Sequence, residues 1–237
     1  YRASWGGHMR VLLLLLGLMP SVCFASPVTI PHVPEYTWTY GCSPTAGAEV
    51  LGYFDLNGYE NLFAASGWDQ VSLTTNVTRE ILELAGYMGT NVSNGATWSY
   101  NISPGMVRYV AAHGYTCTTA TVAYSLSAWS LLTGYIDEGA PILAAVDSNG
   151  DGEPDHSVVI VGYEDRETDG LWYGYYTGWT ETETVQWAPY RGLSGSYPWG
   201  LSDFTDVDLA AVPVPASLFL FAAGLLGIAV SRRKMRR

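Results

Sequence analysis

Signals for helices fill the first part of the chain and signals for strands fill the last part, an order that limits the fold class. Helices are predicted where Ser-Pro or Thr precedes an apolar face, beginning at Ser43-Pro44, Thr78, Ser103-Pro104, and Ser125 or Ser127. Strands are predicted where β-branched and aromatic runs alternate with Asp/Gly clusters, in PILAAV, HSVVIVGY, LWYGYYTGW and TVQWAPY. This order predicts an α+β fold, with helices near the N-terminus packed on an antiparallel sheet.

The N-terminal end is predicted to be an export signal that takes no part in the fold. Met9-Arg10 gives a basic start, the run VLLLLLGLM is too short to span a bilayer, and Ala25 is a small residue at a cleavage position. These features predict a signal peptide over residues 9–25. A lipobox ending at Cys23 is the alternative, disfavoured because Val22 is larger than the residue usual before such a cysteine.

The C-terminal end, residues 212–237, combines a proline-broken lead-in, an apolar run from Ala216 to Val230 and a terminal Arg/Lys cluster. It resembles the PEP-CTERM sorting tail of Gram-negative bacteria, with Val214-Pro215-Ala216 at the Pro-Glu-Pro position. The resemblance implies recognition by an exosortase, cleavage near the prolines, and release to the cell surface or extracellular matrix. The alternative is a plain C-terminal membrane anchor, with the basic end on the cytoplasmic side.

Residues 27–211 form the predicted single domain, and this part of the chain is strongly acidic. It holds four arginines against all 22 Asp and Glu residues of the chain. Such a charge balance argues against nucleic acid and anionic membranes as partners, and it favours solubility outside the cell or divalent cations. Contact with a membrane is therefore expected only through the C-terminal tail before processing.

Cys42 and Cys117 are the two cysteines of this domain, and a disulfide between them is one hypothesis. The surroundings of Cys42 favour another, because a cysteine just before a Ser-Pro helix start lies near the positive end of the helix dipole and near unpaired N–H groups. Both stabilise a thiolate. Gly41 leaves space for a substrate backbone, and the Cys42 N–H can serve as an oxyanion donor.

A thiolate nucleophile needs a base, and the domain offers three histidines. His32 lies in the extended, Pro-flanked segment PHVP, and His113 ends a predicted helix, where a cation favours the helix dipole. His156 opens the apolar run SVVIVGY, so its ring is expected at the mouth of a central strand. This rigid position favours His156 as the base.

The segments WTYGCSPTAGAEVLGYFDLNGY and DSNGDGEPDHSVVIVGYED resemble the papain-like cysteine peptidases of family 39, whose best-known members trim bacteriocin leaders. The resemblance covers nearly the whole domain and implies a papain-like fold. It also implies that Cys42 is the nucleophile and His156 the general base. The expected reaction is attack of the Cys42 thiolate on a peptide carbonyl, formation of an acyl-enzyme, and hydrolysis.

Two positions depart from the family pattern. Where the family has an oxyanion-binding Gln, this chain reads PEYTWTY, so Tyr36 or Trp38 would have to donate. Where the family has an Asn or Asp that orients the histidine, this chain reads YYTGW, so the Thr177 hydroxyl is the expected orienter. Two alternatives stay open beside the peptidase: a degenerate, non-catalytic binding or matrix module, and an amidase or transpeptidase that uses the same dyad.

An acidic loop precedes His156 and matches D-x-[DN]-x-D-G, the oxygen spacing of a calcium loop. The candidate ligands are Asp147, Asn149, Asp151, Glu153 and Asp155. The bidentate Glu usual at the twelfth place is missing, because Val158 stands there. The alternative is an acidic hairpin turn. A bound Ca²⁺ would rigidify the segment that presents His156 and is not required for the chemistry.

Overall fold

The computed structural model describes residues 26–63, 74–179 and 184–211. The helices are α1 (Cys42–Leu56), α2 (Thr75–Met88), α3 (Ser99–Ala112) and α4 (Trp129–Asp137). Short 3₁₀ turns lie at Leu126–Ala128 and Glu167–Asp169. The predicted signal peptide and sorting tail lie outside the described residues. Within those residues, no helix is both long and apolar enough to cross a membrane.

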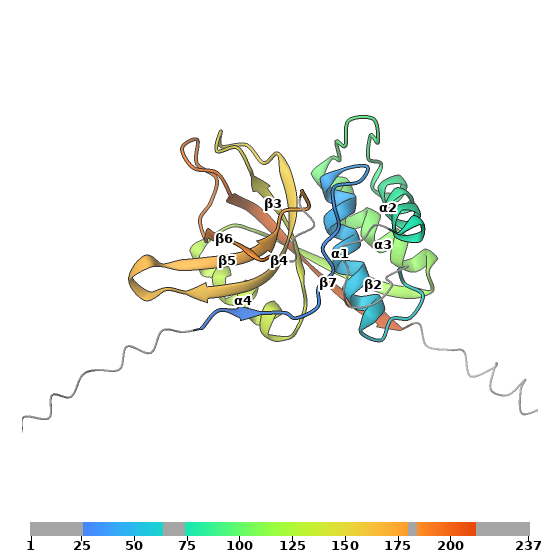
Figure 1. The fold of residues 1–237 in the computed structure, drawn as a ribbon, viewed down its shortest axis with the longest axis horizontal. Helices are drawn as coiled ribbons and strands as arrows, with labels where there is room; N and C mark the ends of the chain where they lie inside the picture. The colour runs from blue at the N-terminus through green and yellow to red at the C-terminus, as the bar shows by residue number, and fades with distance from the viewer. Residues whose placement is uncertain (1–25, 64–73, 180–183, 212–237) are drawn as a thin grey trace, which may run out of the picture.

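The sheet has seven strands in the order β2-β7-β3-β4-β5-β6, with β1 paired to the far part of β4, and every pairing is antiparallel. The strands are β1 (Val28–Thr29), β2 (Tyr115–Ala123), β3 (Ile142–Asp147), β4 (His156–Asp165), β5 (Leu171–Tyr176), β6 (Gln186–Pro189) and β7 (Gly200–Ala211). Helices α1, α2 and α3 lie together on one side of the molecule, and α4 lies on the other side with the strands β3 to β6 (Figure 1). The predicted α+β fold, with helices packed on an antiparallel sheet, is therefore confirmed.

Strands β2 and β7 were not predicted, although they are the longest adjacent pair in the sheet. The residues of β2 alternate between partly buried and exposed positions for most of its length, which is typical of an edge strand with a weak apolar signal. In β7, Asp203, Asp206 and Asp208 interrupt the apolar run, yet the strand lies between β2 and β3. Acidic residues in a central strand hide it from a search for apolar runs.

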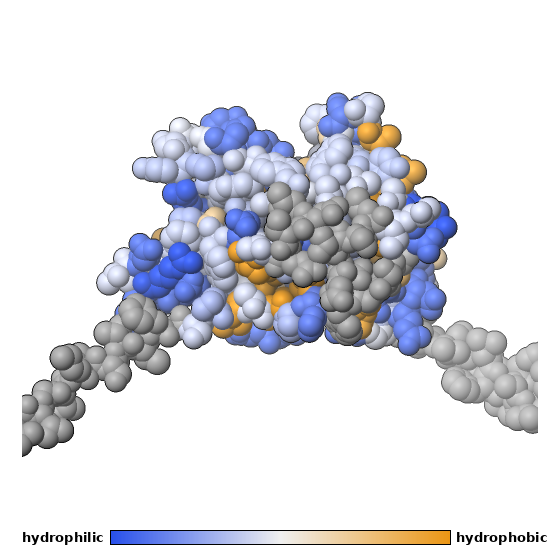
Figure 2. Space-filling view, viewed as in Figure 1, coloured by the Kyte–Doolittle hydropathy of each residue, from blue (hydrophilic) through white to orange (hydrophobic). Residues whose placement is uncertain are grey.

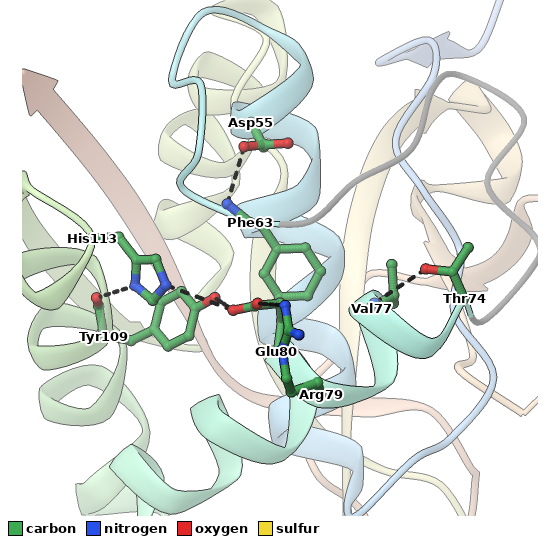
Figure 3. A network of polar contacts seen from close by, with 8 residues as sticks. All are labelled: Asp55, Phe63, Thr74, Val77, Arg79, Glu80, Tyr109 and His113. Carbon is green, nitrogen blue, oxygen red and sulfur yellow. Dashed lines mark hydrogen bonds and ion pairs between the residues drawn. The ribbon is translucent and has the colours of Figure 1, made fainter.

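Two helices begin earlier than predicted. Helix α2 begins at Thr75, and the side chain of Thr74 accepts the Val77 N–H at 3.2 Å, as expected of a helix cap (Figure 3). Helix α3 begins at Ser99, so Pro104 lies inside the helix instead of in its first turn. The prediction took Pro104 as the first helical residue, so it put the start of α3 about one turn too late.

The helices and the sheet share one apolar core. It includes fully buried Leu51, Leu84 and Tyr109 from the helices, and Val159 and Phe204 from the strands. Burying one such side chain contributes roughly 1.5–3 kcal/mol. The first seven residues of β4 are all buried, so this strand is covered on both faces, and α1 and α4 both pack against it. The strand that begins with His156 is thus held rigidly.

Candidate active site

Cys42 is the first residue of α1, and the chain enters the helix through a tied loop. Gly41 caps the helix with φ 144° and ψ 154°, a backbone conformation essentially restricted to glycine. The hydroxyl of Thr45 donates to the Gly41 carbonyl at 2.7 Å and accepts the Thr39 N–H at 3.0 Å. The Thr of the Gly-Cys-Ser-Pro-Thr segment therefore fixes the loop that presents the cysteine.

The sulfur of Cys42 contacts His156 and Ser157, the first two residues of β4. Burial alone would raise the pKa of the Cys42 thiol. The hydrogen bond from His156 and its charge lower that pKa, as do hydrogen bonds from the N–H and hydroxyl of Ser157, and the net result is a pKa below the ordinary value. Cys42 and His156 also line the same cavity, and their action as a catalytic pair stays a prediction.

The ring of His156 is fixed by the main chain that follows β5. Its Nε2 lies 2.7 Å from the carbonyl oxygen of Thr177. Because a carbonyl can only accept, this contact requires a proton on Nε2, and Nδ1 is then the nitrogen of the neutral ring without a proton. The ring also stacks on Trp179, with centroids 4.3 Å apart, and meets Trp199 edge-on at 6.3 Å.

The expected role of the Thr177 hydroxyl needs correction. This hydroxyl accepts the Trp179 N–H at 3.1 Å, and it is the main-chain carbonyl of Thr177 that contacts His156. Beside it, the Gly178 carbonyl accepts the Trp38 N–H, which ties this segment to the chain leading into α1. A main-chain carbonyl thus occupies the place where the resemblance implied an Asn or Asp side chain.

Replacing Thr177 with valine is expected to change kcat/KM less than about fivefold, because the carbonyl remains and the hydroxyl serves only a local turn. Steady-state hydrolysis of a peptide substrate is the measurement. A loss of a hundredfold or more would show that the hydroxyl itself orients His156.

Ser43 and Ser157 join the helix to the strand at this point, a contact that the sequence analysis missed. Their hydroxyl oxygens lie 2.9 Å apart, and both residues are buried. Ser43 does not cap α1, because the cap residue is Gly41 and no side chain caps this helix. The pair locks the first turn of α1 against the first residues of β4, the two elements that carry Cys42 and His156.

A cavity of about 650 Å³ opens onto Cys42 and His156. One wall comes from the helical side of the molecule and the other from the sheet side, and the surface is hollowed between these two halves at the top of Figure 2. Aromatic side chains stand around it, namely Trp38, Trp98 and Trp179, and each is at least 42% exposed. The cavity has the form of a groove between two walls that an extended chain could enter.

The structure does not bring Tyr36 to this cavity. Tyr36 is fully buried, and its hydroxyl lies 2.9 Å from the point where a Cβ on Gly52 would be. Gly52 is ten residues beyond Cys42 in α1, about 15 Å along the helix axis. Tyr36 therefore cannot donate to an oxyanion at Cys42, whereas Trp38, the other candidate, lines the cavity.

The carboxylate of Asp147 binds the main chain of the acidic loop. Asp147 accepts N–H groups from Gly150, Asp151 and Gly152 at 2.6–3.2 Å. Burial alone would raise the pKa of Asp147, but these backbone hydrogen bonds hold it below its ordinary value.

Three of the other candidate calcium ligands also accept hydrogen bonds from within the loop. Asn149 accepts the Asp151 N–H, Asp151 accepts the Glu153 N–H, and Asp155 accepts hydrogen bonds from Ser148 and Asn149. Three or more carboxylates of this loop do not converge to within 4.8 Å of one another. Calcium binding stays a prediction, and the acidic hairpin turn stays its alternative.

His113 does not line the cavity. It belongs to a network of polar contacts with Tyr109 and Glu80 (Figure 3). Its Nδ1 lies 2.9 Å from the Tyr109 carbonyl, and its Nε2 lies 3.6 Å from the carboxylate of Glu80. Glu80 also accepts the Tyr109 hydroxyl at 2.8 Å and pairs with Arg79 at 3.2 Å. Glu80, Glu83 and His113 lie close enough together to hold a metal ion. The contacts above, however, already give the Glu80 carboxylate partners within the protein. The network ties α2 to α3.

Cys42 and Cys117 are both free thiols, so the hypothesis of a disulfide between them is wrong. Cys117 lies on β2, and burial, with added repulsion from Asp208 and Asp206, raises the pKa of its thiol to about 11. The two thiols of the domain are thus shifted in opposite directions. Only the environment of Cys42 favours a thiolate.

The helical half, the antiparallel sheet and the groove between them define the class of α+β domains with the papain-like cysteine peptidase fold. The model of the Peptidase C39-like family matches residues 29–190, and the chain belongs to this family. Residues 211–234 match the PEP-CTERM protein-sorting motif, which supports export and membrane-associated sorting in Gram-negative bacteria. Among curated proteins, no match to the chain was found.

Proposed function

We propose that the domain is a cysteine peptidase, with Cys42 as nucleophile, His156 as general acid and base, and the Thr177 carbonyl as the group that orients His156. The observation that carries the proposal is the contact between the Cys42 sulfur and a His156 ring whose Nε2–H is held at 2.7 Å by a carbonyl. With its proton held on Nε2, the neutral ring has Nδ1 free to accept the proton of the thiol. Proton exchange between the two groups requires this tautomer.

In the proposed reaction, the proton of Cys42 moves to Nδ1 of His156, and the thiolate attacks the carbonyl carbon of a peptide bond. The N–H of Cys42, at the start of α1, donates to the oxyanion. His156 then gives its proton to the leaving amine, and a thioester to Cys42 remains. Water attacks the thioester as His156 takes its proton, and the carboxylic acid and the thiol are released.

The sorting motif sets where this activity would be displayed. We infer that an exosortase processes the tail, and that the acidic domain is released to the cell surface or extracellular matrix. The match of residues 211–234 to the sorting motif supports this step. The strongly acidic composition of the domain also supports it, because such a charge balance favours solubility.

A non-catalytic, peptidase-like binding module is the second candidate. The position of Tyr36 favours it, because that side chain cannot supply the second oxyanion donor expected of a peptidase. Loss of one such donor lowers kcat by about 10²–10³-fold. Trp38, which lines the cavity, is the side chain of the two that could still donate.

Alkylation of Cys42 by iodoacetamide across pH tests the proposed pair. The rate follows the thiolate fraction, so the wild-type protein is expected to reach half of its limiting rate below the ordinary thiol pKa of about 8.5. In His156→Ala the lowering contacts from His156 are lost while burial remains, so the midpoint should move upward. Mass spectrometry with Cys42→Ala as control assigns the label. A wild-type midpoint at or above the ordinary value would exclude the pair.

A further inference from the structure

A second cavity of about 340 Å³ adjoins the groove. The two cavities share Ser99, Ile102, Ala145 and Asp203, so they form one continuous surface depression. Its walls are the first turns of α3 on one side and strands β3, β7 and β2 on the other. A chain bound at Cys42 can therefore extend into this second cavity.

The sheet register places Asp203 in line with the reacting sulfur. Ser157, which contacts that sulfur, pairs with Ala145, and Ala145 pairs with Asp203. Directly paired residues point to the same face of a sheet, and neighbouring strands lie about 4.8 Å apart, so Asp203 lies roughly 10 Å from Ser157 on the groove face. The small side chain of Ala145 leaves the floor between them open.

Asp203 has no cationic partner among the described residues. Its carboxylate accepts one hydrogen bond there, from the Ser202 hydroxyl at 2.9 Å. No lysine occurs in the described ranges, and the four arginines are held elsewhere, by Glu80, the Tyr87 carbonyl, Glu164 and the Pro198 carbonyl. A carboxylate in a cavity with no protein cation beside it favours a cation from the ligand.

Aromatic side chains at the same cavity favour the same ligand. Tyr100 lines the second cavity and is 70% exposed. It stacks on Trp98, with ring centroids 6.0 Å apart and an interplanar angle of 15°. Exposed faces of tyrosine and tryptophan attract lysine and arginine side chains, whereas they offer nothing to an anion.

We propose that the groove selects a peptide carrying a lysine or arginine, whose cationic end binds Asp203 in the second cavity. The inference rests on the proposed function, because it takes the peptide to be bound with its scissile bond at Cys42. An extended chain advances about 3.3 Å per residue, so the cationic residue lies about one to three residues from that bond, depending on how far its side chain reaches. Asp203 is then a specificity-determining residue.

Binding to the full chain with Cys42→Ala tests this without catalysis. Short peptides that span both sides of the scissile bond carry a lysine at one position in turn, and norleucine at the same position is the uncharged control. We expect about tenfold tighter binding of lysine over norleucine at one or two neighbouring positions. Adding Asp203→Asn should abolish this difference. Adding Asp203→Lys should reverse the charge preference, so that a peptide with glutamate at the same position binds more tightly than the lysine peptide. Tryptophan fluorescence is the readout.

Asp208→Asn is the matched control, because Asp208 lies on the same strand but outside both cavities, and the lysine preference should survive it. Equal binding of lysine and norleucine at every position, or a preference that Asp203→Asn leaves unchanged, overturns the inference. Hydrolysis by the wild-type protein separates the two proposals. Cleavage without lysine preference rejects the inference alone, whereas an Asp203-dependent preference without any cleavage rejects the peptidase and keeps the site.

Discussion

Replacing Cys42 with alanine is expected to lower kcat/KM for peptide hydrolysis by at least about 10⁴-fold, because the reaction loses its nucleophile. His156→Ala should cost a similar factor, since the thiolate and the proton donor to the leaving amine both depend on that ring. The double variant should be no slower than either single variant, because the two residues act as one unit. Cleavage of internally quenched peptides by the purified protein gives these rates.

Cys117→Ala provides the matched control for this experiment. Cys117 is the other free thiol of the described chain, lies on β2 outside the groove, and has a raised pKa. Its loss should leave hydrolysis unchanged within about twofold. Hydrolysis that survives Cys42→Ala would exclude Cys42 as the nucleophile. A wild-type protein whose Cys42 alkylates readily but which cleaves no peptide would instead favour another amide as substrate.

The positions of Cys42 and His156 could be predicted because their signals are local. A glycine and a cysteine before Ser-Pro mark the start of a helix, and a histidine before a run of valines marks the mouth of a buried strand. Both elements form where expected, with α1 starting at Cys42 and β4 starting at His156. The buried length of β4 requires that a helix pack on it, and α1 does.

The partners of these two residues could not be predicted, because they depend on which strands become neighbours. The group that orients His156 is a main-chain carbonyl, and every residue at position 177 has one, so its side chain carries no signal. Ser157 binds the sulfur only because β4 passes beside the first turn of α1. Tyr36 was placed near Cys42 by spacing along the chain, but its ring packs on α1 beside Gly52.

The position of Asp203 in the groove also could not be predicted from the sequence, because it depends on how the strands pair. It lies in β7, a strand hidden by its own acidic residues, and its relation to the reacting sulfur exists only through the pairing of β7 with β3 and β3 with β4. Ser202 is the extra residue of a bulge in β7, between the pairs Ala145–Asp203 and Val146–Leu201. A one-residue slip of β7 against β3 would turn Asp203 to the other face of the sheet. Specificity in this fold therefore depends on register, which local patterns do not encode.

Gly41→Ala is expected to reduce both stability and activity, because Gly41 meets two independent constraints. Its φ of 144° with ψ of 154° is strained for any residue with a side chain, and a Cβ there would lie 2.7 Å from the carbonyl oxygen of Gly95. The free energy of unfolding should fall by about 3 kcal/mol. Because the clash displaces the residue that precedes Cys42, kcat/KM should fall by at least about a hundredfold.

Gly58→Ala is the control that separates the backbone strain of a positive φ from the steric clash expected at Gly41. Gly58 also has a positive φ, 106°, but nothing lies within 4 Å of the Cβ that alanine would add, and it follows the far end of α1. Its cost should be about 1–2 kcal/mol of stability, with kcat/KM unchanged within about twofold. Denaturant unfolding and peptide hydrolysis measure both quantities on each variant. If Gly41→Ala and Gly58→Ala behaved alike, the close approach of Gly41 to Gly95 would have no part in placing Cys42, and the tie from Thr45 would be sufficient to hold the thiol beside His156.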